Sequence, residues 1–210
     1  MKRILIFDDH EVVREGIKRI FDEQPGTVAF GPAGTAAEAL NLARNEDWDV
    51  AVLDLSLGDR SGLEVLKELQ QIRPRLPVLI LSMHSEEQYA RRAFKGGAAG
   101  YITKDSPRTE LLKAIEKVIA GGRYVSPTLA DKLVFDIERG TDRPPHEALS
   151  DREFEVMRLI AAGKTVSEIA EMLSLSDKTI STYRSRLLEK MRMKTNAELI
   201  HYAIKNKLVE

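Results

Sequence analysis

The sequence predicts two domains: a doubly wound α/β domain with a five-stranded parallel sheet, then a smaller all-α domain of four helices that contains a helix-turn-helix. Three observations support this prediction. Short apolar runs alternate with helical patterns as far as residue 121. Residues 149–208 carry helical patterns and no strand pattern. Between these regions, the stretch RGTDRPPHEAL at 139–149 combines adjacent prolines, a glycine and mixed charge, which is typical of an exposed connection.

The five predicted strands are short runs of mostly apolar residues. Such continuous apolar character is expected for strands that are buried on both faces of a parallel sheet. The runs are 3–7, 28–31, 50–53, 78–81 and 100–102. Because helical patterns separate them, each pair of consecutive strands is predicted to be joined by a helical crossover in one open sheet.

Helical patterns and helix-start signals fill the intervals between the strands. Apolar residues recur at helical spacing at Val12, Val13, Ile17, Ile20 and Phe21, and again along 63–72 and 111–119. Capping boxes, in which a hydroxyl residue is followed three positions later by Glu or Gln, are predicted at Thr35, Ser61 and Ser85. Ser106 is a predicted helix cap, because the following Pro107 suits the first turn of a helix.

The composition excludes several classes of protein. The chain has 210 residues, 43% of them hydrophobic and 31% charged, which is ordinary for one large or two modest globular domains. It contains no cysteine, which excludes disulfides, thiolate catalysis and Cys-zinc sites. No apolar stretch approaches the roughly 18 residues that a membrane span needs, and the N-terminus lacks a signal-peptide pattern. We therefore expect a cytoplasmic protein with no membrane partner.

Polar residues follow the predicted strands where those strands end. Asp8 and Asp9 follow the first strand, Asp54 the third, Ser82 the fourth, and Lys104 comes shortly after the fifth. In open α/β sheets, functional sites gather outside the carboxyl ends of the strands. A single carboxylate at a strand end is usually a solvated loop residue, but this combination at separate strand ends predicts one shared site.

The residue types indicate phosphoryl chemistry at that site. Three clustered carboxylates repel one another unless a cation lies among them, and a set of oxygen ligands favours Mg²⁺. One carboxylate could then attack phosphorus and form an aspartyl phosphate, while Lys104 neutralises charge on the phosphoryl oxygens. Asp54 is the best candidate nucleophile because its strand lies centrally, between the acid pair and Lys104. Ser82 could donate a hydrogen bond to the attached phosphate.

Residues 1–121 resemble the receiver domain of two-component response regulators, which has a flavodoxin-like fold. The resemblance is carried by Asp8-Asp9, Asp54 in LDLSL, Gly62, Ser82, Tyr101 and Lys104. It implies that a sensor histidine kinase is a partner and that Asp54 is the phosphoacceptor. It implies Asp9, Asp54 and the carbonyl of Ser56 as Mg²⁺ ligands, with Asp8 acting through water. It also implies that Ser82 and Tyr101 move together on phosphorylation.

A connecting segment is predicted between the two domains. Ser126-Pro127 opens a helical pattern that contains Leu129, Leu133, Val134 and Ile137, before the proline-rich stretch ends it. We therefore place a receiver domain at 1–121, a connecting helix and linker at 122–147, and the helical domain at 148–210.

The helical domain carries its own start signals and a basic helix. Capping boxes are predicted at Ser150, Thr165 and Thr195, and residues 173–176 form a tight joint between its second and third helices. Its third helix has an inward apolar stripe, formed by Ile180, Tyr183, Leu187 and Met191. Residues 176–194 contain six basic and two acidic residues, a bias that hints at an anionic polymer as partner.

This domain resembles the LuxR-type, or NarL/FixJ-type, DNA-binding domain through LSDREFEVMRLIAAGKTVSEIAEMLSLSDKTISTYRSRLLEKM. The resemblance implies that double-stranded DNA is a partner and that the protein binds it as a homodimer. It implies phosphate contacts by Lys178 and Thr179, and a place along the DNA backbone for Lys190. The side chains implied to face the major groove are Ser181, Thr182, Arg184 and Ser185. The last helix, with Leu199, Tyr202 and Ile204, is a candidate dimer surface.

Taken together, the two halves predict a DNA-binding transcriptional response regulator that is switched by Mg²⁺-dependent phosphorylation of Asp54. The alternative is an orphan regulator whose receiver acts as a phosphorylation-independent dimerisation module. A phosphatase with an aspartyl nucleophile is disfavoured, because such enzymes carry a second acid two residues after the nucleophile and this chain has Ser56 there. A regulator driven by a small ligand is disfavoured by the acid cluster. We therefore expect no enzymatic activity.

Overall fold

The computed structural model describes residues 2–22, 26, 28–57, 60–131 and 144–209. The chain divides into two compact units, Met1–Phe135 and Asp136–Glu210. The predicted limits at residues 121 and 148 remain predictions. Within the described residues, no helix has the length and apolar character needed to cross a membrane.

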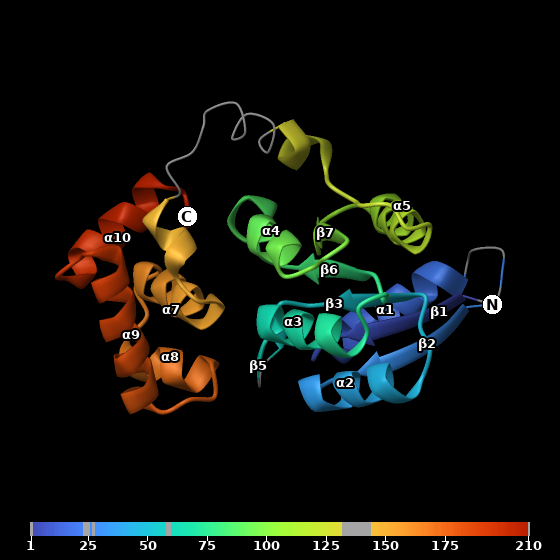
Figure 1. Cartoon of the computed structure of the whole chain (residues 1–210), viewed down its shortest axis with the longest axis horizontal. Coiled ribbons are helices and arrows are strands. Elements are labelled where there is room, and N and C mark those ends of the chain that lie inside the picture. Colours follow the sequence, from blue (N-terminus) through green and yellow to red (C-terminus); the bar gives the residue numbers. More distant parts are fainter. Residues whose placement is uncertain (1, 23–25, 27, 58–59, 132–143, 210) are drawn as a thin grey trace. The chain divides into compact units, whose positions relative to one another are not determined.

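The first unit is built on a five-stranded parallel sheet with strand order β2-β1-β3-β6-β7 (Figure 1). Its strands are β1 (Lys2–Phe7), β2 (Val28–Ala33), β3 (Val50–Leu53), β6 (Val78–Ser82) and β7 (Gly100–Thr103). The doubly wound fold and all five predicted strands are therefore confirmed. A short antiparallel pair, β4 (Ser56–Leu57) and β5 (Arg60–Ser61), was not predicted, because strands of two residues carry no periodic signal.

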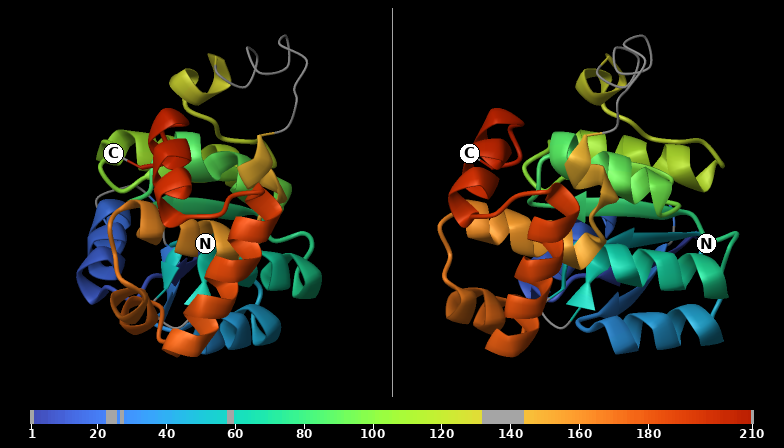
Figure 2. Two further views of the ribbon diagram at one scale, coloured as in Figure 1. Left: turned by 90° about the vertical axis from the view of Figure 1, so that its left-hand side faces the viewer. Right: turned by 60° about the vertical axis from the view of Figure 1, so that its left-hand side comes forward.

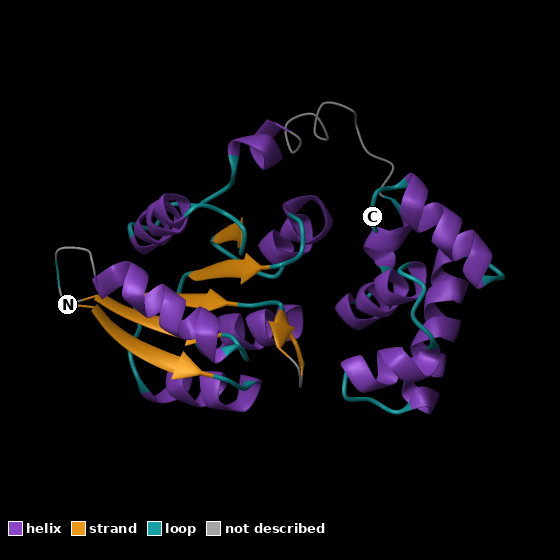
Figure 3. Cartoon of the chain, turned by 180° about the vertical axis from the view of Figure 1, so that it is seen from behind, coloured by secondary structure: helices purple, strands orange, loops and turns teal. Residues whose placement is uncertain are grey.

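Helices cover both faces of this sheet, as the opposite views in Figures 1 and 3 show. They are α1 (Glu11–Asp22), α2 (Ala36–Asn45), α3 (Gly62–Ile72), α4 (Glu86–Lys95) and α5 (Arg108–Ile119). One core cluster joins Ile17 and Phe21 of α1 and Ile115 of α5 to alternate strand residues such as Ile4 and Ile6. Because successive strand residues point to opposite faces, the residues between them, such as Leu5, face the helices of the other layer.

The predicted helix caps are confirmed in part. The Thr35 hydroxyl accepts a hydrogen bond from the Glu38 N–H at 3.2 Å, as a capping residue should. Ser61 and Ser85 stand at the N-caps of α3 and α4, but neither makes a side-chain cap bond. The prediction for Ser106 is wrong by one residue, since the N-cap of α5 is Pro107. The Ser106 hydroxyl instead lies 3.0 Å from the hydroxyl of Thr103.

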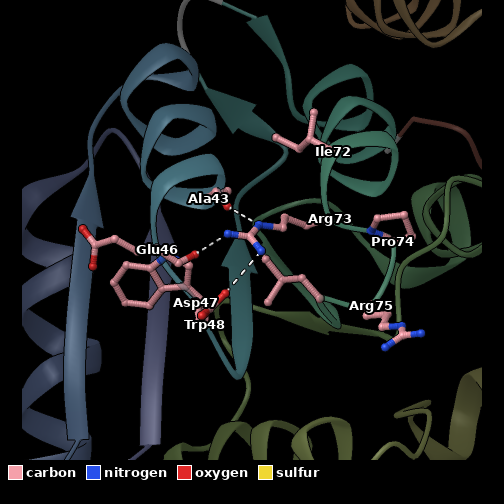
Figure 4. A pocket seen from close by; sticks show the side chains of 9 residues that line it. Ala43, Glu46, Asp47, Trp48, Ile72, Arg73, Pro74 and Arg75 are labelled. Carbon is pink, nitrogen blue, oxygen red and sulfur yellow. Dashed lines mark hydrogen bonds and ion pairs between the residues drawn. The ribbon is translucent and has the colours of Figure 1, made fainter.

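A pocket of about 470 Å³ lies beside the ends of α2 and α3 (Figure 4). Its lining includes Trp48 and Leu76, which precede β3 and β6, so it lies at the amino ends of the strands, away from Asp54. The Arg73 guanidinium donates to the carbonyls of Ala43, Arg44 and Glu46 and thereby caps the C-terminal end of α2. The pocket is therefore built around a helix-capping arginine whose guanidinium is already bound within the fold.

Trp48, the one tryptophan of the chain, packs against the backbone of Gly31 in β2. A Cβ atom on Gly31 would lie 2.3 Å from the indole ring, so only glycine fits there. The fluorescence of Trp48 therefore reports on the folding of the first unit alone.

The start of the connecting segment packs on the first unit. The Tyr124 N–H donates to the Ala99 carbonyl at 2.9 Å, and Tyr124 forms a parallel bridge with Gly100 of β7. Residues 127–131 are helical, and Ser126 caps that helix by accepting a bond from the Leu129 N–H at 3.2 Å. The predicted apolar positions Leu133, Val134 and Ile137 lie outside the described residues.

Within its described residues, the second unit has helices and no strand, and α9 is the longest of these helices (Figure 2). It contains η1 (Pro145–Ala148), α7 (Asp151–Ala161), α8 (Val166–Met172), α9 (Asp177–Met191) and α10 (Asn196–Lys205). The capping boxes at Ser150 and Thr165 are confirmed with both reciprocal bonds. The box at Thr195 is only half correct, because the Glu198 carboxylate accepts from the N–H of Lys194.

Two further features define this unit. Ser174, in the turn between α8 and α9, has a left-handed backbone with φ of 53°. The predicted inward stripe of α9 is buried at Ile180, Leu187 and Met191, whereas Tyr183 is only half-buried. A tight turn followed by a helix with one buried face is the geometry of a helix-turn-helix, so this prediction is confirmed.

Candidate functional site

Three carboxylates meet at the carboxyl edge of the sheet, as the sequence predicted. One ligand atom from each of Asp8, Asp9, His10 and Asp54 lies within 4.8 Å of the others. The side chains of Asp8 and Asp54 are only 2% exposed, whereas that of Asp9 is 34% exposed. Pairing of β1 with β3 places these residues together, because Phe7 is in register with Leu53 and the acids follow directly.

Lys104 joins the two buried acids. Its Nζ lies 2.7 Å from Asp8 Oδ2 and 2.7 Å from Asp54 Oδ2. The second oxygen of Asp54 accepts from the Ser56 N–H at 3.1 Å, and the second oxygen of Asp8 accepts from the His10 N–H at 2.9 Å. Both buried carboxylates are therefore held in one orientation by a shared cation and by backbone N–H groups.

The backbone around Asp54 is fixed by close packing. The Asp54 N–H donates to the Phe7 carbonyl at 2.8 Å. A Cβ atom added to Gly62 would lie 2.4 Å from the Asp54 carbonyl oxygen and 2.5 Å from the Cα of Leu55. Gly62 therefore allows α3 to start directly against the backbone that carries Asp54.

The pKa shifts at the site reflect burial and charge. Burial raises the pKa of Asp54, and the Lys104 ammonium opposes this shift without cancelling it. Burial lowers the pKa of Lys104, but its hydrogen bonds to Asp54 and Asp8 outweigh that effect, so the pKa is raised overall. Lys104 is therefore firmly protonated, while Asp54 is a carboxylate whose negative charge is only partly stabilised by the protein.

The predicted switch residues lie together beside the acids. Ser82 and Tyr101 are fully buried. The Ser82 hydroxyl accepts from the His84 N–H at 3.2 Å, and the Tyr101 hydroxyl donates to the His84 carbonyl at 2.8 Å. Burial raises the pKa of Tyr101, so its hydroxyl stays protonated and able to donate. Both residues thus contact the same short loop between β6 and α4.

The acid cluster fits a hard divalent cation. Its donors are carboxylate oxygens on fixed backbone, which is the ligand type that Mg²⁺ prefers. Ser56, whose carbonyl was predicted as a further ligand, is exposed at the start of β4 and lies next to the cluster through its bond to Asp54. His10 also reaches the cluster, with Nδ1 2.7 Å from Asp9 Oδ1.

The exposed face of α9 carries most of the predicted DNA contacts. Lys178, Ser181, Thr182 and Ser185 are exposed, and Thr179 is half-buried. The Thr182 hydroxyl donates to the Lys178 carbonyl at 2.9 Å, and the Ser185 hydroxyl donates to the Ser181 carbonyl at 3.0 Å. Since these hydroxyl protons are used within the helix, their oxygens present acceptors, and the cationic side chains remain the main donors of this face.

Two predicted DNA contacts already have partners within the second unit. Arg184 is half-buried, and its Nε donates to the Asn196 Oδ1 of α10 at 2.7 Å. Lys190 Nζ lies 2.6 Å from Glu153 Oε2 of α7. The DNA contacts of Arg184 and Lys190 therefore remain predictions, and both side chains already have partners within the fold.

Several contributing residues were not predicted from the sequence. His84 binds Ser82 and Tyr101 through its backbone, and its ring Nε2 lies 3.2 Å from the Ser56 hydroxyl. Arg14 donates to the Asp8 carbonyl at 2.6 Å. Because His84 contacts Ser82 and Tyr101 through its backbone, no signal in the sequence identified this role.

Comparison with known proteins accounts for both units. Residues 4–116 match the family model of the response regulator receiver domain. Residues 147–203 match the model of bacterial regulatory proteins, luxR family. The two matches follow one another along the chain in the order that the sequence predicted.

Similar proteins span the whole chain. Response regulator UvrY of Escherichia coli strain K12 is 34% identical over 209 residues, which cover 99% of this chain and 96% of UvrY. Response regulator GacA of Pseudomonas protegens is 35% identical over 210 residues, covering 100% of this chain and 99% of GacA. A solved structure of RcsB from Salmonella enterica serovar Typhimurium, bound to a promoter in the presence of the phosphomimetic BeF3⁻, is 27% identical with a TM-score of 0.60, covering 96% of this chain and 97% of RcsB. The chain therefore belongs to the two-component response regulators of the NarL/FixJ family, a class of DNA-binding transcription regulators and not of enzymes.

Proposed function

We propose that a sensor histidine kinase switches this regulator by phosphorylating Asp54 in the cytoplasm, and that the phosphorylated chain binds DNA as a homodimer. The observation that carries the proposal is the cluster of Asp8, Asp9 and Asp54, with Lys104 2.7 Å from both buried acids. Such a cluster is poorly suited to a purely structural role, because it concentrates negative charge where the protein excludes water.

The phosphoryl transfer uses Asp54 as nucleophile. A carboxylate oxygen of Asp54 forms a bond to phosphorus, the P–N bond of the phosphohistidine breaks, and the departing imidazole nitrogen takes up a proton. Asp8, Asp9, Asp54 and the carbonyl of Ser56 would hold Mg²⁺, which neutralises phosphoryl oxygen charge when it is bound. Lys104, already protonated beside Asp54, pairs with the new phosphoryl group.

Ser82 and Tyr101 would convert this chemistry into a change of conformation. The Ser82 hydroxyl is buried at the end of β6 and would donate to the phosphoryl group once Asp54 is modified. Tyr101 and Ser82 share His84 as partner, so movement of one alters the surroundings of the other. A useful switch requires the phosphoryl group to favour one state by a few kcal/mol, on the order of 3.

The DNA-binding role rests on α9 and on the relatives. RcsB has been solved bound to a promoter with BeF3⁻, and also as two dimers bound to two parallel DNAs. In this chain, Lys178 and the hydroxyl residues of α9 form an exposed surface suited to phosphates and base edges. We propose Lys178, Thr179 and Lys190 as backbone contacts. The proposed groove contacts are Ser181, Thr182, Arg184 and Ser185.

Phosphorylation is tested with acetyl phosphate, with and without Mg²⁺, by mass spectrometry of the intact chain. The wild type should gain one phosphoryl group only with Mg²⁺, and Asp54→Asn should gain none. Asp105→Asn is the matched control, because Asp105 is an exposed acid beside Lys104 that lies outside the cluster. Full labelling of Asp54→Asn would refute the assignment of the acceptor.

DNA binding is tested on duplexes selected from a random library by acetyl-phosphate-treated wild type. Treatment should tighten binding of the wild type and leave Asp54→Asn unchanged. Lys178→Ala should reduce the slope of log K against the logarithm of the salt concentration by about 1. Lys205→Ala on α10 should leave this slope unchanged. Equal binding with and without acetyl phosphate would instead favour the orphan regulator with a phosphorylation-independent receiver.

A further inference from the structure

The connecting segment is attached to the first unit on both sides of β7. On one side, the Tyr124 hydroxyl donates to Glu110 Oε1 of α5 at 2.6 Å. On the other side, the Ser126 hydroxyl donates to the carboxylate of Glu86, which is the first residue of α4. Tyr124 itself also forms the bridge with Gly100 of β7. The beginning of the connection is therefore bound to α4, β7 and α5 at once.

Ser126 has two roles in this arrangement. Its hydroxyl oxygen accepts from the Leu129 N–H at 3.2 Å, which caps the helix of residues 127–131. Its hydroxyl proton goes to Glu86. Capping needs only the first bond, so the second bond adds a link between the connecting helix and α4 that capping does not require.

A short path leads from this link to the phosphoacceptor site. Ser82, at the end of β6, accepts from the His84 N–H, and Glu86 follows His84 by two residues. The His84 carbonyl also accepts from Tyr101 at 2.8 Å. The loop between β6 and α4 is thus held at one end by the proposed phosphate-binding hydroxyl and at the other end by Ser126.

We propose that Glu86 and Ser126 form a latch through which phosphorylation of Asp54 controls the connecting helix; this rests on the function proposed above. When Ser82 turns toward the phosphoryl group, the His84 backbone moves with it and withdraws the Glu86 carboxylate from Ser126. The connecting helix then loses its attachment to α4, and the helical unit gains freedom to pair on DNA.

The latch is tested by amide-resolved hydrogen exchange of the full chain with Mg²⁺ and BeF3⁻, which mimics the phosphoryl group. The reporters are the amides of Leu129 and Ala130, which bond to the Ser126 side chain and backbone. Their exchange should rise about tenfold, equivalent to about 1.4 kcal/mol. The Tyr124 amide, which bonds to Ala99 in the sheet, is the internal control and should not change.

Variants separate the latch from the helix cap. Glu86→Ala leaves the cap intact, and Ser126→Asp keeps a capping oxygen but places a second carboxylate beside Glu86. Both should raise the exchange of Leu129 and Ala130 without BeF3⁻ and abolish the response to it. Ser126→Thr keeps both bonds and should behave as the wild type. The double variant S126D/E86Q should restore the latch, because its amide can donate to the new carboxylate.

The outcomes distinguish the latch from the phosphoacceptor proposal. Chemical-shift changes at the Ser56 and His84 amides report binding of BeF3⁻ at Asp54. If those amides do not respond, the proposed phosphorylation site is wrong. If they respond while Leu129 and Ala130 exchange as before, the latch is overturned and the phosphorylation site stands. A wild-type response in both Glu86→Ala and Ser126→Asp would also overturn the latch.

Discussion

Asp54 in the first unit and Glu153 in the second are similar carboxylates that the protein treats in opposite ways. Their side chains are 2% and 4% exposed, and a lysine Nζ lies 2.7 Å from Asp54 and 2.6 Å from Glu153. Burial raises the pKa of both. At Asp54 this effect prevails, whereas at Glu153 the bonds to Lys190 and Ser150 outweigh it and the pKa is lowered.

The difference lies in how each lysine is shared. Lys104 is 11% exposed and divides its charge between Asp8 and Asp54, which also repel each other. Lys190 is 43% exposed and, among the described residues, pairs with Glu153 alone. Glu153 also accepts from the Ser150 N–H at 2.7 Å. The ionised Glu153 carboxylate therefore stabilises the fold of the second unit. The Asp54 carboxylate is less well stabilised by the protein and stays available to bind a cation or to react with a phosphoryl group.

The largest effect is expected from crowding the backbone of Asp54. Gly62→Ala places a Cβ 2.4 Å from the Asp54 carbonyl oxygen, so the first unit should lose about 3 kcal/mol of unfolding free energy. Urea unfolding followed by Trp48 fluorescence measures this loss. Gly16→Ala in α1 is the matched control, since nothing lies within 4 Å of the added Cβ, and it should not destabilise. Equal stability of both variants would show that the backbone at Asp54 can move.

A smaller loss is expected when the well-paired anion is removed. Glu153→Gln weakens the bonds to Lys190 and Ser150 and should cost the second unit about 2 kcal/mol. Far-UV circular dichroism during urea unfolding follows the helices of both units, and Trp48 fluorescence identifies the transition of the first unit, so the other transition is that of the second unit. Glu168→Gln, in the exposed capping box of Thr165, should cost less. A reversed order would contradict the role of burial at Glu153.

The pH dependence of Glu153 has a definite sign. Its folded pKa lies below the ordinary value of 4.5, so its stabilisation is fully present above that pH. The contribution is lost as the pH falls through the lowered folded pKa. The wild type should therefore lose more helical-unit stability than Glu153→Gln between about pH 5 and pH 3.

Removal of the poorly paired anion should have the opposite effect. Asp54→Asn relieves the repulsion with Asp8, and without Mg²⁺ the first unit should gain about 1 kcal/mol at pH 7. The gain should shrink as the pH falls toward the ordinary value of 3.8, because the raised pKa lets wild-type Asp54 take up a proton earlier. Trp48 fluorescence measures both, and Asp105→Asn should show neither. A loss of stability in Asp54→Asn would mean that Lys104 fully compensates both acids.

The smallest expected effect concerns the backbone of the helix-turn-helix. Ser174 has φ of 53°, a conformation that disfavours side chains, so Ser174→Gly should stabilise the second unit by about 0.5 kcal/mol. Gly163→Ala, at φ of 82°, should destabilise it instead. Urea unfolding followed by circular dichroism compares the unfolding free energies of the two variants. If both variants were more stable than the wild type, backbone strain would not explain the effect of Ser174→Gly.

The fold and the acid cluster could be predicted because they follow from local rules. Apolar runs define the strands, and parallel connection brings the residues after each run to one edge, which is why Asp8, Asp54 and Lys104 were found together. The partners of Lys190 and Arg184 could not be predicted, since they come from other helices. Likewise, the part of His84 depends on its backbone, which carries no sequence signal.

The bridge between Tyr124 and Gly100 also matters for β7, which stands at one margin of the sheet. Unpaired backbone groups along such a margin invite strands of other molecules to add themselves. A fragment that ends at Gly121 would leave the edge of β7 unpaired and prone to aggregation. A fragment that extends to residue 131 would keep Tyr124 paired with Gly100 at this edge. The first residues of the connecting segment thus also protect the edge strand against aggregation.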